Sequence, residues 1–151
     1  MKSSGIFCSG FIEIQTFDGP KWIKDVKVGD LVLTNQRKYK KVIKIIRSEL
    51  PIDCTDKVYD FYYFIENENN EINEEGLYRI SKSAAIQCIN GFKKVEEIEV
   101  GDLFLCKDKT RVKVQSININ EAKEVSRYIY SLEIEDNSTF YANNICIKDR
   151  L

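Results

Sequence analysis

Five cysteines and no histidine define the side-chain chemistry that this 151-residue chain can carry. The absence of histidine excludes His-containing zinc sites, Ser-His-Asp triads and Cys-His dyads within the chain. The cysteine count is odd and no Cys-x-x-Cys pair occurs, so we expect no disulfide scaffold. Four cysteines lie in or beside apolar, strand-like runs and are expected to pack as small hydrophobic side chains: Cys54, Cys88, Cys106 and Cys146.

Two acidic residues, Asp30 and Asp102, are further candidates because they occupy the same position in two similar segments. One interpretation is a pair of acids that exchange protons during a reaction. The other is structural: each carboxylate accepts hydrogen bonds from backbone N–H groups of its own Gly-Asp turn. We favour the turn. No side-chain set in the sequence indicates a metal ion or a cofactor.

The segments that hold these residues repeat at an offset of 72 residues, as from Asp30 to Asp102. Each copy begins with a hairpin signal, Asp18-Gly19 or Asn90-Gly91, in which glycine supplies a positive φ. Each ends in Val-Gly-Asp-Leu-x-Leu, a turn that leads into a buried strand. An internal repeat sets the architecture, so we predict one domain built from two pseudo-twofold-related halves that share a core.

The predicted domain covers residues 1–151, with halves at 8–65 and 77–149. The polar, acidic stretch 66–76 is predicted to be a mobile, exposed loop between them. Short runs of β-branched and aromatic residues predict an all-β fold, and only residues 121–126 have a helical pattern. The expected strands are 11–16, 31–33, 42–46, 58–65, 77–80, 85–89, 103–106, 111–118, 128–135, 140–142 and 145–147.

The charge balance argues against a nucleic-acid partner. The chain has 23 basic and 24 acidic residues and a net charge of −1, without the basic surplus of a nucleic-acid binder. The most basic segment, residues 37–41, is interpreted as a solvated hairpin tip. No apolar run has membrane-spanning length, so no membrane partner is expected. We expect a reducing intracellular compartment, or a viral particle assembled there.

The first cysteine, the repeat and the end of the chain together resemble the Hint family, the hedgehog and intein autoprocessing domains. The first block of such domains consists of a nucleophilic Cys, a strand, Thr-x-Asp-Gly and a segment that ends in Val-Gly-Asp. The second block contains Thr-x-x-His. The last block reads Val-Tyr-Asp-Leu, followed by Phe-x-Ala-Asn-Gly-Ile-x-Val-His-Asn. The resemblance implies an all-β, horseshoe-like fold of two pseudo-symmetric halves. The matching residues here are Cys8, 12–14, 16–19, 28–30, 81–84, Gly91, 101–103, 129–132 and 141–149.

In such domains the Cys thiolate attacks the carbonyl carbon of the preceding residue, and the peptide bond becomes a thioester. The resemblance therefore implies that Cys8 attacks Phe7, and that Ser81 replaces the Thr that holds the scissile peptide. The reaction needs an ionised thiol, an acid that protonates the departing amide nitrogen, and donors for the oxyanion. The alternatives are a small buried Cys8 and a surface hydroxyl at Ser81.

Departures from the family pattern argue against splicing. Ala84 occupies the position of the His that supplies the acid, and losing such help lowers a rate by roughly 10²–10⁴-fold. Lys148 and Asp149 replace the terminal His-Asn pair, and a carboxylate has no amide nucleophile to cyclise. Arg150, which follows, cannot accept an acyl group. The spacing from Cys8 to Asp18 is also one residue shorter than the common pattern.

Three functions follow from these observations. The first is a degenerate Hint domain without splicing activity, kept as a structural or protein-interaction module with a protein partner or in a larger assembly. The second is an active autoprocessing domain in which Cys8 makes an N–S acyl shift and cleaves the Phe7–Cys8 bond. The third, a β module without this ancestry, is disfavoured by the duplication. If Met1 is the first residue, cleavage would release only residues 1–7, which favours the first function.

Overall fold

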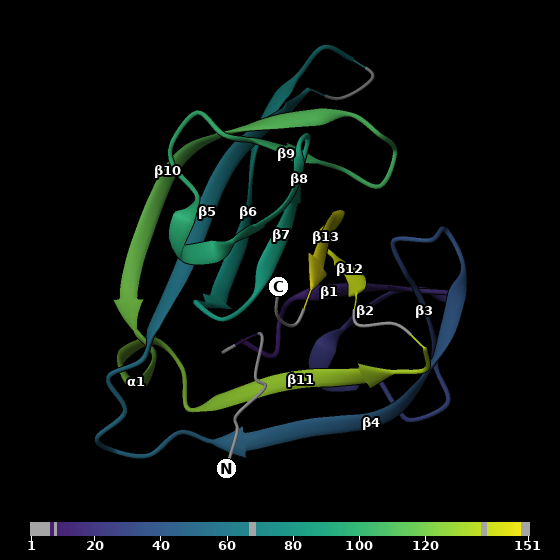
Figure 1. Cartoon of the computed structure of the whole chain (residues 1–151), viewed down its shortest axis with the longest axis vertical. Helices are drawn as coiled ribbons and strands as arrows, with labels where there is room; N and C mark the ends of the chain where they lie inside the picture. Colours follow the sequence, from purple (N-terminus) through teal and green to yellow (C-terminus); the bar gives the residue numbers. More distant parts are fainter. Residues whose placement is uncertain (1–6, 8, 67–68, 137–138, 149–151) are drawn as a thin grey trace.

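The structure, a computed structural model, describes residues 7, 9–66, 69–136 and 139–148, and these form an almost entirely β architecture (Figure 1). The predicted all-β class is confirmed, and the one α-helix among the described residues, α1 (Ala122–Val125), lies within the segment predicted to be helical. No helix in the described part of the chain is long and apolar enough to cross a bilayer. The strands are β1 (Glu13–Thr16), β2 (Gly19–Trp22), β3 (Leu31–Leu33), β4 (Tyr39–Glu49), β5 (Lys57–Glu66), β6 (Ile72–Ser81), β7 (Ala85–Cys88), β8 (Gly91–Lys94), β9 (Leu103–Leu105), β10 (Arg111–Glu121), β11 (Tyr128–Ile134), β12 (Thr139–Ala142) and β13 (Ile145–Lys148).

The two halves correspond element by element at the 72-residue offset, from Glu13 at the start of β1 to Ala85 at the start of β7. In the same way β2 matches β8, β3 matches β9, β4 matches β10, and the 3-10 turn η1 (Ile23–Asp25) matches η2 (Val95–Glu97). Individual hydrogen bonds repeat as well: Gly29 N donates to Val42 O at 2.8 Å, and the equivalent bond in the second half is 2.9 Å. The predicted pseudo-symmetry therefore extends to single backbone contacts.

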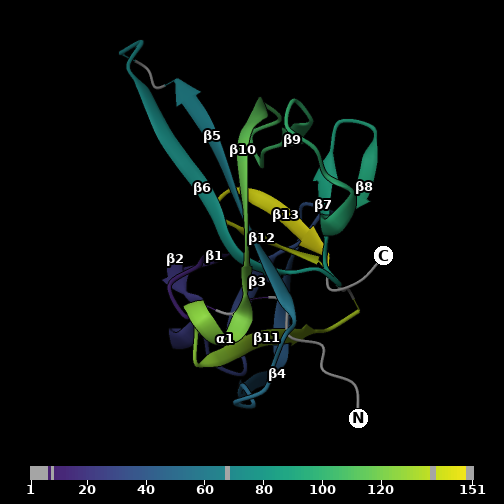
Figure 2. The same ribbon diagram turned by 90° about the vertical axis from the view of Figure 1, so that its left-hand side faces the viewer.

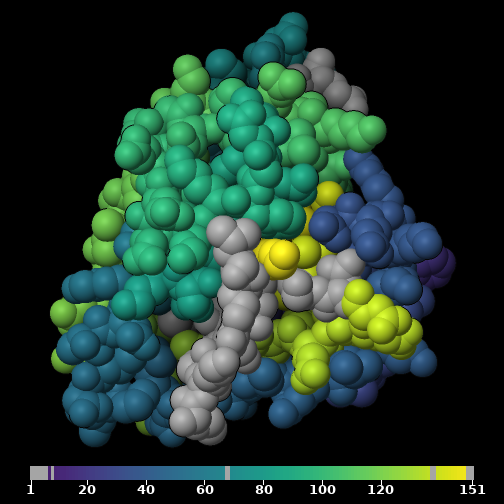
Figure 3. Space-filling model, viewed as in Figure 1, coloured from purple at the N-terminus to yellow at the C-terminus, as the bar shows by residue number. Residues whose placement is uncertain are grey.

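The halves exchange strands and so share one sheet. The long strand β4 pairs with β11, and its counterpart β10 pairs with β5. The hairpin of β12 and β13 joins the halves at the centre, because β12 pairs with β1 and β13 pairs with β7. The path runs β11-β4-β3-β1-β12-β13-β7-β9-β10-β5-β6, and the sheet curls as it does so (Figures 1 and 2). In the space-filling view β13, in yellow, lies between the two halves (Figure 3).

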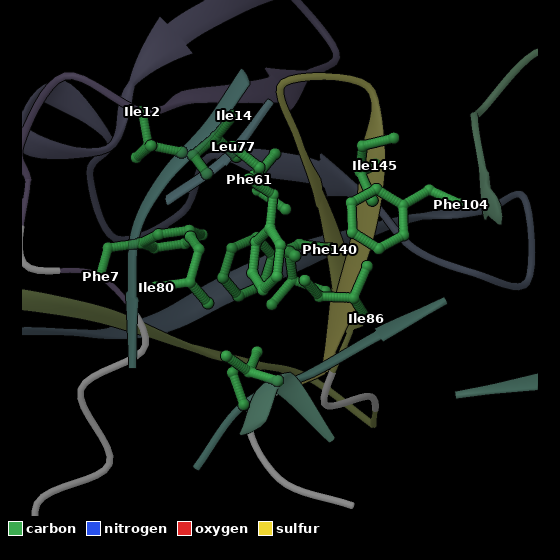
Figure 4. Packing of buried hydrophobic residues seen from close by; sticks show 14 of the residues in the cluster. Phe7, Ile12, Ile14, Phe61, Leu77, Ile80, Ile86, Phe104, Phe140 and Ile145 are labelled. Atoms are coloured by element: carbon green, nitrogen blue, oxygen red, sulfur yellow. The ribbon is translucent and has the colours of Figure 1, made fainter. Parts of the chain in front are cut away.

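The curled sheet encloses a core to which both halves contribute aromatic rings and branched aliphatic side chains (Figure 4). Phe61 and Phe104, from different halves, pack edge to face with their ring centroids 5.6 Å apart. Repeat-equivalent positions such as Ile14 and Ile86 are both fully buried. The hydrophobic pattern of the repeat therefore places equivalent residues in one common core.

The connection between the halves is shorter than the sequence predicts. Residues 72–76, predicted as loop, form the first half of β6 and pair with β5, for example Glu75 with Tyr63. The aromatic strand β5 supplies the pairing partner, and this tertiary contact overrides the low β-propensity of the acidic segment. The segment is nevertheless exposed, as predicted, from Ile72 to Glu75. The hairpin of β5 and β6 projects from the body as an arm (Figure 2).

Candidate functional site

Phe7 joins the two ends of the sheet. Its backbone N–H donates to Tyr130 O in β11 at 3.1 Å, and Tyr130 N–H donates back to Phe7 O at 2.6 Å. Phe7 also forms an isolated bridge with Ile80 in β6. Because β11 and β6 are the first and last strands of the path, this single residue closes the sheet between its two ends.

The Phe7 side chain belongs to the core. It is fully buried, and its ring lies 5.9 Å from the ring of Phe140. Figure 4 shows it beside Ile80. In the chemistry implied by the family resemblance, the Phe7 carbonyl carbon is the atom that Cys8 would attack. The hydrogen bond from Tyr130 N–H to the Phe7 oxygen is of the kind that stabilises a tetrahedral oxyanion. Cys8 itself lies outside the described residues.

Ser81 is the residue after Ile80, which forms the bridge with Phe7. The Ser81 hydroxyl makes its hydrogen bonds within its own turn. Ser81 Oγ lies 2.9 Å from Ser83 Oγ and accepts a hydrogen bond from Ser83 N–H at 3.3 Å. The first half has the same turn, in which Phe11 N–H donates to Ser9 Oγ at 3.2 Å. The Ser81 hydroxyl therefore stabilises this turn through its hydrogen bonds with Ser83.

Ala84, at the position expected for the His, is fully buried and is part of the core cluster. Its N–H donates to Ser81 O at 3.1 Å, and its carbonyl accepts from Val95 N–H at 3.0 Å. Its repeat counterpart is Ile12, which is also buried. The position is thus an apolar core position in both halves, and the methyl group of alanine supplies no proton.

The last block ends beside this turn. In β13, Ile147 pairs with Ile86 and Lys148 pairs with Ala85, the residue after Ala84. The Lys148 ammonium lies over the ring of Phe92, 5.5 Å from its centroid. Asp149 and Arg150 lie outside the described residues. Phe7, the turn from Ser81 to Ala84, and Lys148 are therefore linked through neighbouring strand pairings.

The turn between β12 and β13 fixes this arrangement. Asn143 and Asn144 have φ values of 48° and 71°, which suits a two-residue hairpin of type I′. The Asn143 carboxamide accepts a hydrogen bond from Glu13 N–H and donates one to Gly76 O, each at 3.0 Å. One side chain thus ties the central hairpin to β1 and β6, which belong to different parts of the sheet.

Sequence reasoning missed Ser131, the neighbour of Tyr130. It is 1% exposed, and its hydroxyl has no hydrogen-bond partner among the described residues. Its counterpart in the first half is Asp60, which accepts a hydrogen bond from Arg79 N–H at 2.7 Å and also pairs with the Arg79 guanidinium. The signal that could have found this position is the alignment of Tyr59-Asp60 with Tyr130-Ser131, which extends the repeat with a gap of one residue.

Asp30 and Asp102 have the structural role that we favoured. Each carboxylate accepts a hydrogen bond of 2.9 Å from the backbone N–H three residues earlier. Each also pairs with a lysine nine residues earlier, at 3.2 Å for Lys21 and 2.8 Å for Lys93. Burial opposes ionisation, but these hydrogen bonds and charges outweigh it and lower the pKa of both carboxyl groups. Each aspartate therefore stabilises its own turn.

The other cysteines pack as expected. Cys88, Cys106 and Cys146 are buried, and Cys54 is half-buried. Burial raises the pKa of the Cys88 thiol to about 11 and that of Cys146 to about 12, so neither is a thiolate at neutral pH. Within residues 7, 9–66, 69–136 and 139–148, no cluster of three or more His, Cys, Asp or Glu side chains could hold a metal ion.

No protein-family model matches the sequence, and no curated protein sequence matches it. Solved structures do. The gp41-1 intein is 22% identical with a TM-score of 0.66, over 94% of this chain and 95% of that one. A bacterial intein-like domain from Clostridium thermocellum is 17% identical with a TM-score of 0.70, over 97% and 99%.

The MchDnaB-1 intein is also similar, with 14% identity and a TM-score of 0.63 over 93% of this chain and 98% of that one. All three likenesses span almost the full length of both chains. This chain therefore has the Hint, or intein-like, fold.

Proposed function

We propose that this chain is an intein-like domain that neither splices nor cleaves itself, and that serves as a structural or protein-interaction module within a larger protein assembly. The observation that carries the proposal is the place of Phe7. Phe7 is the residue that cleavage before Cys8 would detach, yet it is fully buried and pairs with the two ends of the sheet.

The energetic argument follows from that burial. Replacing a buried Phe by Ala costs about 3–5 kcal/mol, and the whole folding free energy of a domain is roughly 5–15 kcal/mol. A domain that released Phe7 would lose a contribution of similar size, together with the hydrogen bonds to Tyr130. Under this proposal, retention of Phe7 is therefore part of what stabilises the fold.

The proton-transfer argument points the same way. The amide nitrogen of Cys8 would need a proton as it leaves. Ala84 cannot donate one, no histidine exists in the chain, and Ala84 lies fully buried in the core cluster. Lys148, at the other expected His position, extends its ammonium over Phe92.

One observation favours the alternative function, cleavage of the Phe7–Cys8 bond through an N–S acyl shift by Cys8. The Phe7 carbonyl oxygen already accepts a 2.6 Å hydrogen bond from Tyr130 N–H, so an oxyanion formed there would have a donor in place. Under this alternative the scaffold is poised, Ser81 still helps to hold the peptide, and proton transfer alone is missing.

A fusion experiment separates the two functions. The chain is placed between two folded reporter proteins, and the products are separated by size after expression and after incubation with a thiol. The proposal predicts the intact triple fusion throughout, with no joined reporters and no released N-terminal reporter. Thiol-dependent release of the N-terminal reporter, abolished by Cys8→Ala, would establish the alternative.

The variant Ala84→His sharpens the comparison. If the site is poised and lacks only an acid, this variant releases the N-terminal reporter in thiol, and Ala84→His with Cys8→Ala does not. An added acid helps only if the thiol lies within about 3–3.5 Å of the Phe7 carbonyl carbon. The proposal predicts an intact fusion for the variant too, with thermal unfolding as the check that the larger side chain leaves the domain folded.

A further inference from the structure

A surface groove lies on the side of the molecule where β6 rises beside the hairpin of β1 and β2 (Figure 2). Its volume is about 370 Å³, and it is open to solvent along one side. It lies apart from Ser81, Ala84 and Lys148, none of which lines it. Three of its lining residues, Glu13, Asn143 and Asn144, belong to segments that resemble the family's sequence blocks. Its aromatic residues do not, so they need an explanation of their own: Phe11, Trp22, Tyr63 and Tyr78.

Aromatic side chains form the walls of the groove. Phe11 and Trp22 stand edge to face, with ring centroids 5.6 Å apart, and both are exposed, at 64% and 40%. Tyr78 lines the side contributed by β6. Exposed aromatic rings on a protein surface are characteristic of binding sites, because they bury a large area at low conformational cost.

The charge of the groove is negative. Glu13 and Glu75 line it, and no lysine or arginine does. No salt bridge in the described part of the chain involves either carboxylate. Burial raises the pKa of the Tyr78 hydroxyl, and the negative charge of Glu75 acts in the same direction. A cation would therefore be attracted to a site whose two carboxylates have no counter-ion.

One aromatic residue of the groove, Phe11, already makes a cation–π contact within the chain. The Lys24 ammonium lies over the face of Phe11, 5.1 Å from the ring centroid, and 3.7 Å from the carboxylate of Asp25. Aromatic faces attract ammonium and guanidinium groups through the ring quadrupole. Trp22 and Tyr78 offer further faces of the same kind beside the two free carboxylates.

We propose that this groove binds an extended segment of a partner protein through a lysine or arginine side chain, which lies between the aromatic walls and pairs with Glu13 and Glu75. The inference deepens the proposed interaction role by naming its surface and the chemistry of its partner. An open groove suits a side chain that arrives on a longer segment, whose flanking apolar residues cover Phe11 and Ile65.

The chain carries its own reporter for the test, because Trp22 is the only tryptophan and lines the groove. The probe is a pool of acetylated, amidated hexapeptides with arginine or lysine fixed at the third position and Val, Thr, Ser or Gly elsewhere. A matched pool has glutamine at the third position. The proposal predicts a saturable change in Trp22 emission with the basic pool, weakened by salt, and none with the glutamine pool.

Single variants identify the contacts. Glu13→Gln and Glu75→Gln are each expected to weaken binding about two- to fivefold, as for exposed ion pairs, and the double variant about tenfold. Phe11→Ala is expected to weaken it by a similar factor. The control is Glu97→Gln in η2, an exposed carboxylate that does not line the groove and should leave binding unchanged.

Any of the following results would overturn the proposal: no saturable change up to about 1 mM of the basic pool, equal binding of the glutamine pool, or unchanged binding by the Glu13→Gln, Glu75→Gln double variant. Argininamide alone binding as tightly as the pool would indicate a small-cation site and would also reject a peptide segment. The titration and the fusion experiment fail independently, because a domain that cleaves itself could still bind the pool, and a non-cleaving domain could fail to bind it.

Discussion

Two repeat-related junctions between strands are stabilised by different chemistry. In the first junction, Asp60 on β5 binds both the backbone N–H and the guanidinium of Arg79 on β6. In the second junction the counterparts are Ser131 on β11, whose hydroxyl has no partner among the described residues, and Phe7, which lies 72 residues before Arg79 in the sequence. One junction is a nearly buried ion pair, and the other is a fully buried aromatic ring.

The difference shows which requirement the fold imposes. The strand that crosses the end of the sheet must be held, and either an ion pair or a packed ring can hold it. At the junction where an autoprocessing domain carries out its chemistry, this chain has the packed ring. The second junction therefore depends on apolar packing, where the first depends on an ion pair.

The largest expected effect is that of Phe7→Ala. Loss of a buried ring should lower the free energy of unfolding by about 3–5 kcal/mol, measured by urea denaturation. Phe17→Ala, which removes a ring that is 68% exposed, is the matched control and should change it by less than about 0.5 kcal/mol. Equal effects of the two changes would show that Phe7 does not close the sheet.

The first junction should respond to Arg79→Ala. This change leaves the Asp60 carboxylate, whose side chain is 4% exposed, without its cation. Because the Arg79 side chain is itself 30% exposed, we expect a loss of about 2–3 kcal/mol, below the value for a fully buried pair. A loss under about 0.5 kcal/mol in the same denaturation assay would mean that solvent replaces the guanidinium without cost.

Ser131→Ala should act in the opposite direction. Removing a buried hydroxyl that has no partner should stabilise the domain by up to about 1 kcal/mol, seen as a higher midpoint of unfolding. Asp60→Ala at the equivalent position should destabilise it, because Asp60 binds the backbone of Arg79. Destabilisation by Ser131→Ala would reveal a hydrogen bond to the Ser131 hydroxyl from outside the described residues.

The smallest effect concerns the Asp30 and Asp102 turns. A carboxyl group whose pKa is lowered on folding stabilises the native state above its unfolded pKa of about 3.9, and this contribution is lost as the pH falls through the folded pKa. Asp30→Asn and Asp102→Asn should each cost roughly 0.5–1 kcal/mol at pH 7 and little at pH 2. Unfolding curves at both pH values provide the test, and a cost that is independent of pH would contradict it.

Much of the fold followed from the repeat, because equivalent residues such as Ile14 and Ile86 must face one core. The Gly-Asp turns were predicted correctly for a similar reason: their hydrogen bonds are local and depend on a few neighbouring residues. The beginning of β6 was not predicted, since its pairing with β5 depends on a tertiary partner and not on its own composition.

Only part of the candidate site could be predicted from the sequence. Local motifs located Ser81, Ala84 and Lys148, and pairing brings them near Phe7. The role of Phe7 in closing the sheet depends on strands β6 and β11, far apart in the sequence, and no local pattern encodes it. The unpartnered hydroxyl of Ser131 likewise becomes visible only when burial and hydrogen bonding are known.

The central claim is that the Phe7–Cys8 bond stays intact, and the intact mass of the unmodified chain tests it most directly. The purified protein is incubated at neutral pH for several days, with and without an added thiol, and its mass is recorded alongside that of Cys8→Ala. The account predicts one species at full mass in every sample. A species that corresponds to residues 8–151, formed in thiol by the unmodified chain and not by Cys8→Ala, would contradict it.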